Sequence, residues 1–121
     1  GLAPGAYAYQ PETHVLLRNC DGDLRREIAS ASLGQVCVET CAAICVLTVE
    51  YERTTSEYGE RGIQYVHYEV GHSAQNVLLQ AVGVGLAAVV VGAFSEEKVA
   101  GCLALPDEQK PVYMIAVGNP R

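Results

Sequence analysis

With 121 residues, half of them hydrophobic and 18% charged, the chain is long enough to bury a core of its own, which argues against a disordered protein. Its formal net charge is −6 and it has only eight Lys and Arg residues, which argues against a nucleic-acid partner, because phosphate contacts require clustered basic side chains. We therefore predict one domain over residues 1–121.

Turn residues and hydrophobic patterns predict most elements of the fold. In chain order, we expect strands over residues 13–17, 43–51, 87–91 and 112–117, helices over 24–33 and 95–105, a helical turn over 35–40, and a long helix that begins at Thr54. Asp21 and Asp23 offer caps for the first helix, and Ser95 for the last. This order predicts an α+β fold, in which an antiparallel or mixed sheet packs on a long central helix.

The long helix has the clearest start signal. Thr54 and Glu57 stand three residues apart, as in a capping box that satisfies two free backbone donors. Seven apolar residues follow at steps of three and four and predict a buried stripe about 33 Å long: Ile63, Val66, Val70, Ala74, Val77, Ala81 and Val84. Gly71 within the helix costs about 1 kcal/mol relative to Ala, so we expect another element to approach closely there.

The uncharged run of residues 77–94 is long enough to be weighed as a membrane span. Gln80 and three glycines interrupt it, and its character changes from helical spacing to a β-branched run. A helix that ends near Gly83 or Gly85, followed by a buried strand, explains the run better. We therefore predict no membrane partner.

Five cysteines, an odd number, occur without a signal-peptide pattern, so we expect reduced thiols in a cytoplasmic protein. Cys37, Cys41 and Cys45 recur four residues apart, as on one face of a helix. Zinc and iron–sulfur motifs favour closer pairs, and Cys45 lies in a stretch typical of a buried strand. We predict no metal site, with a cysteine-based metal protein as an alternative.

Other residue patterns point to no particular chemistry. His67 and His72 do not share a helix face, and Glu69 with His72 is a single pair without further ligands. The Gly83-x-Gly85 pattern follows a helix rather than a strand, unlike a dinucleotide fingerprint. Taken alone, these residues indicate only an α+β domain.

Four segments carry a family resemblance: Tyr58-Gly-Glu-Arg-Gly-Ile-Gln-Tyr65, Glu69-Val-Gly-His-Ser-Ala-Gln-Asn76, Val89-Val-Val-Gly-Ala-Phe94 and Val117-Gly-Asn-Pro-Arg121. Together they resemble the FMN-dependent nitroreductase superfamily and, within it, the SagB-type dehydrogenases. The resemblance extends over nearly the whole chain but corresponds to the C-terminal part of that fold. We therefore expect a partial nitroreductase-like fold.

The resemblance implies FMN bound at a homodimer interface and hydride transfer through flavin N5, with NAD(P)H or a substrate as the electron donor. The segment at Val91 and Gly92 corresponds to the strand and loop whose backbone N–H groups approach N5 and O4. Preorganised amides of this kind stabilise charge that develops on the reduced ring. Arg121 corresponds to the basic residues that hold the flavin phosphate, for which Arg is chemically suited.

In SagB-type azoline dehydrogenases, a Lys-Tyr pair before the long helix serves proton transfer, and Glu57-Tyr58 corresponds to it here. Tyr58 is retained as a candidate acid or hydrogen-bond donor. Glu57 replaces the lysine, which argues against azole formation. The implied function is an oxidoreductase acting on a small-molecule or peptide substrate. The alternative is a flavin-free relative that serves as a binding or assembly module, because the family's segments for FMN phosphate and ribityl have no counterpart in this sequence.

Overall fold

The computed structural model describes residues 1–120 and begins with a two-stranded antiparallel hairpin. Its strands are β1 (Gly5–Gln10) and β2 (Val15–Asp21). The strand predicted over residues 13–17 is confirmed only from Val15, because His14 has a φ of 54° in the turn and β2 begins two residues later than predicted. Pairing with the Tyr-containing segment before the turn extends β2 to Asp21.

A three-stranded antiparallel sheet lies at the centre, in the order β3-β5-β4. Its strands are β3 (Ala43–Val49), β4 (Ala87–Val91) and β5 (Lys110–Gly118). The prediction for β4 is confirmed, whereas β3 is shorter and β5 longer than predicted. β5 includes Pro111 although it is the central strand, and the register shifts between Leu47 and Thr48, opposite that proline. A bulge tolerates the missing N–H of proline in a sheet interior.

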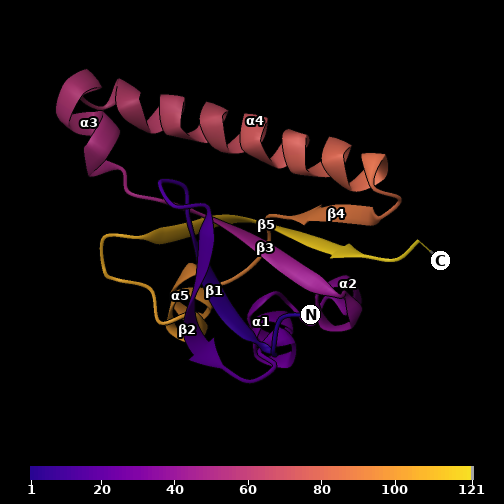
Figure 1. The fold of residues 1–121 in the computed structure, drawn as a ribbon. Helices are drawn as coiled ribbons and strands as arrows, with labels where there is room; N and C mark the ends of the chain where they lie inside the picture. The colour runs from indigo at the N-terminus through magenta and orange to yellow at the C-terminus, as the bar shows by residue number, and fades with distance from the viewer. Residues whose placement is uncertain (121) are drawn as a thin grey trace.

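Helices cover both faces of this sheet (Figure 1). They are α1 (Arg25–Ala31), α2 (Val36–Thr40), α3 (Glu52–Tyr58), α4 (Arg61–Gly83) and α5 (Glu96–Cys102). α4 crosses one face, and α1, α2 and α5 lie on the other. On that second face Val38, Val99 and Met114 are fully buried in the hydrophobic core. The α+β prediction, with a sheet packed on a long helix, is confirmed.

Of the predicted caps, Ser95 is confirmed. Leu24 occupies the N-cap of α1 and Asp21 lies in β2, so that Asp23 bonds only to the Arg25 that begins the helix. The backbone N–H of Arg25 donates to Asp23 Oδ1 at 3.1 Å, and the Arg25 guanidinium donates to both carboxylate oxygens at 2.8 and 2.6 Å. These side-chain bonds, with the backbone bond, lower the pKa of Asp23 to about 2. At the start of α5, Ser95 Oγ accepts from the Lys98 N–H at 3.4 Å. α1 and α5 are both shorter than predicted.

The helix predicted to begin at Thr54 is in fact two helices. α3 begins at Glu52, and Gly59, with a φ of 60°, reverses the chain before α4. Thr54 and Glu57 lie inside α3, so the capping-box prediction is wrong. The turn brings α3 so close to α4 that a Cβ on Gly62 would lie 3.0 Å from the Thr54 carbonyl oxygen. Close approach therefore occurs at Gly62 and not at Gly71, where a Cβ would meet nothing within 4 Å.

The apolar stripe of α4 is buried only in its middle. Val66, Ala74 and Ala81 are buried, whereas Ile63 is 44% and Val84 59% exposed, so the prediction is wrong at both ends. A repeat of three and four averages 3.5 residues against 3.6 per turn, and the mismatch rotates the two ends apart by about 60° over three heptads. The central turns face the sheet, while the ends rotate away from it.

The uncharged run of residues 77–94 divides as predicted, since its first part ends α4 and its second part forms β4. A turn with Gly85 at a φ of 78° separates the helix from the strand. Within residues 1–120, no helix combines the length and the hydropathy that crossing a bilayer would demand.

Candidate functional site

A groove forms where the end of β3 meets α3 and the first half of α4. Its volume is about 730 Å³, within the range of small-molecule sites. Aliphatic side chains, hydroxyl groups, two tyrosines and three charged side chains line it: Leu47, Thr48, Val49, Glu50, Arg53, Thr54, Tyr58, Tyr65, Val66, Glu69, Val70 and Ser73. We call it the Tyr58 groove.

Tyr58, the predicted acid, is the last residue of α3 and is 53% exposed. Its ring meets the ring of Tyr65 edge to face, with the centroids 5.4 Å apart. The contact depends on Gly59, whose positive φ folds α3 onto α4. Glu57, which replaces the family lysine, is exposed and does not line the groove. Of the pair Glu57-Tyr58, only Tyr58 therefore lines the groove.

The charges that line the Tyr58 groove do not cancel. The Arg53 guanidinium pairs with Glu50 through contacts of 3.0 Å from Nη2 to Oε1 and 2.5 Å from Nε to Oε2. Gln109 Nε2 also donates to Glu50 Oε1, at 3.2 Å. Glu69 is exposed and forms no ion pair with any basic side chain of residues 1–120. The lining thus carries one uncompensated carboxylate.

A tyrosine–histidine pair fastens the start of α3 to α4. Tyr51 Oη lies 2.7 Å from His67 Nε2, and the two rings meet edge to face at 5.7 Å. Burial raises the pKa of the Tyr51 hydroxyl, and the nearby Glu96 carboxylate raises it further. Sequence patterns miss this pair because its members stand on opposite sides of the turn at Gly59, which helical periodicity does not indicate.

Val91 and Gly92, whose backbone is predicted to face a flavin, lie at the end of β4. The Val91 side chain is 2% exposed and packs in the core with Met114, which leaves only its backbone for a ligand. Gly92 is exposed, and a Cβ there would lie 3.7 Å from the ring of Tyr113. The Gly92 N–H takes part in none of the turn and loop backbone hydrogen bonds of residues 1–120. An N–H without a backbone partner, on an exposed residue, is a donor of the kind that a flavin ring acceptor requires.

The predicted site residues do not line a common hollow. Neither Val91 nor Gly92 lines the Tyr58 groove. Arg121 lies outside the residues that the structure describes. The candidate site therefore consists of two separate parts, the Tyr58 groove and the exposed backbone at Gly92.

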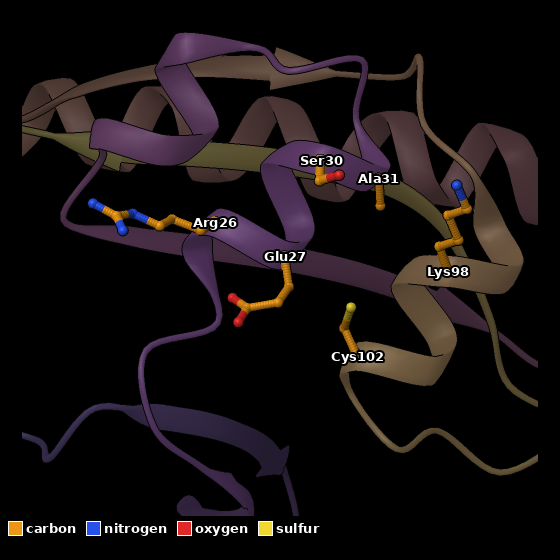
Figure 2. Close-up of a pocket in the computed structure, with 6 residues that line it drawn as sticks. All are labelled: Arg26, Glu27, Ser30, Ala31, Lys98 and Cys102. Carbon is orange, nitrogen blue, oxygen red and sulfur yellow. The ribbon is translucent and has the colours of Figure 1, made fainter.

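A more open pocket of about 490 Å³ lies on the opposite face of the sheet, between α1 and α5 (Figure 2). It is lined by Arg26, Glu27, Ser30, Ala31, Lys98 and Cys102. Figure 2 shows the ends of the Arg26 and Lys98 side chains extending away from each other, so the two cations do not converge on one ligand. This pocket contains none of the predicted site residues, and we assign the candidate site to the Tyr58 groove and Gly92.

The three cysteines spaced by four residues do not form a cluster. Cys37 lies in α2, Cys41 follows that helix, and Cys45 lies in β3, where a strand was predicted. Burial raises the pKa of the Cys41 and Cys45 thiols, which keeps them protonated and disfavours metal binding. Within residues 1–120, no three His, Cys, Asp or Glu side chains are grouped as metal ligands.

Comparisons with known proteins match nearly the whole chain. Residues 6–119 match the model of the nitroreductase family. A curated relative from Methanocaldococcus jannaschii, named as a nitroreductase, is 40% identical over 119 residues, which cover 98% of this chain and 59% of the relative. The chain thus spans less than two thirds of the length of that relative.

Solved structures show the same arrangement of the sheet and the long helix. A structure named as a nitroreductase, from Anabaena variabilis, superposes with a TM-score of 0.94 at 30% identity, covering 100% of this chain and 25% of that chain. The NADPH:FMN oxidoreductase of Vibrio harveyi, complexed with NAD⁺, superposes with a TM-score of 0.67 at 27% identity, covering 79% and 45%.

Proposed function

The chain belongs to the nitroreductase family, and from that premise we propose that it works as an FMN-dependent oxidoreductase that transfers hydride through flavin N5. The observation that carries the proposal is that Gly92, an exposed residue after β4, has an N–H that takes part in none of the turn and loop backbone hydrogen bonds of residues 1–120. The named flavin function of the Vibrio harveyi structure supports it. In this proposal the chain is the C-terminal part of a nitroreductase-like fold.

When bound, FMN supplies a ring that accepts and releases hydride. The backbone N–H of Gly92 would donate a hydrogen bond toward the ring. The Tyr58 hydroxyl donates a proton to the substrate that is being reduced. Its half-exposed position in a groove of about 730 Å³ leaves room for a small molecule beside it.

The finer assignment is to the SagB-type dehydrogenase branch, on the strength of the segment that begins with Tyr58. NAD(P)H is the proposed electron donor, and nitro compounds, quinones or oxidised peptide heterocycles are the compatible substrates. Azole formation is not proposed, because Glu57 stands in place of the lysine. A homodimer is proposed, because α4 exposes Leu79 and Val82 at 62% and 74%, and exposed apolar residues of this kind mark interfaces.

The separation of Tyr58 from Gly92 favours a second candidate, a flavin-free relative that acts as a binding or assembly module. In this candidate the Tyr58 groove binds a ligand or partner without redox chemistry. A flavin titration distinguishes the two functions, because only the first requires the backbone donor at Gly92.

The deciding experiment is an FMN titration of the full chain, followed by flavin fluorescence. We expect Gly92→Ala to retain binding, because its Cβ would meet only the Tyr113 ring at van der Waals distance. Gly92→Pro, which removes the N–H, is expected to lose binding, with circular dichroism as the control for folding. An absence of binding to the unmodified chain overturns the flavin proposal and leaves the binding module.

A turnover assay tests the role of Tyr58. Tyr58→Phe keeps the ring contact with Tyr65 but removes the hydroxyl proton, so we expect a loss of turnover on the order of 10²-fold with FMN binding unchanged. Tyr68→Phe is the matched control, because Tyr68 is similarly exposed on α4 and does not line the groove. Equal activity of the two variants would remove Tyr58 from the mechanism.

A further inference from the structure

The Glu69 carboxylate, which has no ion-pair partner, determines which ligand charge the Tyr58 groove favours. Arg53 is the only basic residue in the lining, and Glu50 holds it through two close contacts. Glu50 and Glu69 against Arg53 leave a lining charge of −1. The lining of the groove therefore favours a cationic ligand over an anionic one.

The aromatic wall of the groove favours the same charge. Tyr58 and Tyr65 stand edge to face at 83°, so their rings present differently oriented surfaces beside the hollow. The Arg61 guanidinium already lies 5.7 Å from the centroid of the Tyr65 ring. Arg61 does not itself line the groove, and its contact indicates that the Tyr65 ring is available for a cation–π interaction.

The side chains that line the groove narrow the class of ligand further. Leu47, Val66 and Val70 supply aliphatic surface to the same hollow, which favours an apolar ring over a compact ammonium ion. The hydroxyl groups of Thr54 and Ser73 supply polar contacts at the lining. A flat aromatic ring would therefore pack against the aliphatic and aromatic side chains of the groove. A positive charge on that ring would be attracted to the Glu69 carboxylate.

We propose that the Tyr58 groove binds planar aromatic cations, with the ring against the tyrosines and the charge toward Glu69. The assignment names the substrate class of the Tyr58 site and rests on the proposed function only for the role of Tyr58 in turnover. Neutral rings of the same shape keep the aliphatic contacts but lose both the cation–π term and the attraction to Glu69.

The test compares N-methylquinolinium with quinoline, by calorimetric titration of the full chain at a pH where quinoline is neutral. We expect the cation to bind about tenfold more tightly than the neutral ring. Glu69→Gln is expected to remove most of this preference while keeping the affinity for quinoline. Glu12→Gln, in the β1–β2 turn, is the matched control and is expected to keep the preference. Tyr65→Leu is expected to weaken the binding of N-methylquinolinium more than the binding of quinoline.

Equal affinity for the two rings, binding of neither, or equal effects of Glu69→Gln and Glu12→Gln would overturn the proposal. The titration contains no flavin, so its result is independent of the FMN experiment. Cation binding without FMN binding would retain this inference and reject the oxidoreductase. FMN binding without a preference for the cation would retain the oxidoreductase proposal and reject this inference.

Discussion

The two faces of the central sheet differ in how completely they are packed. On the face of α1, α2 and α5, Val38, Val99 and Met114 are fully buried in one continuous core. On the face of α4, the helix has exposed apolar residues at its ends, α3 buries no residue, and a large groove remains open. The difference teaches that the fully buried core lies mainly on the first face, whereas the second face holds the Tyr58 groove to which we assign the candidate site.

The largest expected effect lies on the packed face. Met114→Ala leaves a cavity in the core, so we expect the free energy of unfolding to fall by about 2–5 kcal/mol. Gln75→Ala on α4, where the side chain is exposed, is the control and is expected to change it by less than about 0.5 kcal/mol. Urea denaturation measures both, and similar losses would break the comparison between the faces.

Two glycines of α4 sharpen the comparison within the open face. Gly62→Ala forces a Cβ to within 3.0 Å of the Thr54 carbonyl oxygen, and such overpacking costs about 1–3 kcal/mol. Gly71→Ala meets open space and is expected to stabilise the helix by about 1 kcal/mol. Thermal unfolding followed by circular dichroism should therefore shift in opposite directions. A loss of stability in Gly71→Ala would show that a further surface packs against this side of α4.

The smallest effect is expected at the rim of the packed face, where Asp23 is bonded to Arg25. The pKa of Asp23 is lowered from 3.8 to about 2 in the folded protein, so its ionised form contributes stability that is fully present above the unfolded value and is lost as the pH falls through the folded value. Asp23→Asn should therefore be less stable than the unmodified chain near neutral pH, and this difference should vanish in strong acid. A difference that persists in acid would mean that charge is not its cause.

Sequence patterns predicted the packed face better than the open one. The β-branched run of β4 and the Ser95 cap are local signals, and both are found at the predicted residues. The break at Gly59 was missed, because glycine in a helical pattern indicates only a weakened helix and does not show whether the chain reverses there. The missed reversal also concealed the contact of α3 with α4 at Gly62.

The candidate site was predictable only where a motif marked its residues. The resemblance picked out Tyr58 and Gly92, and the structure places both at exposed positions. It did not indicate that the Glu69 carboxylate lacks an ion pair, because this depends on the folded structure, in which Arg53 pairs with Glu50. Nor did it indicate the bond between Tyr51 and His67, which exists only once α3 is folded back.

The absence of buried residues in α3 has a consequence for how fast the open face exchanges its ligands. A segment that buries little apolar surface detaches at a small fraction of the global unfolding free energy, as a cooperative unit of its own. The turn at Gly59 and the bond between Tyr51 and His67 hold the two ends of α3, and the edge-to-face contact of Tyr58 with Tyr65 adds to them. We therefore expect α3 to detach from α4 at a lower free energy than the sheet unfolds, which would shorten the residence time of a ligand in the Tyr58 groove.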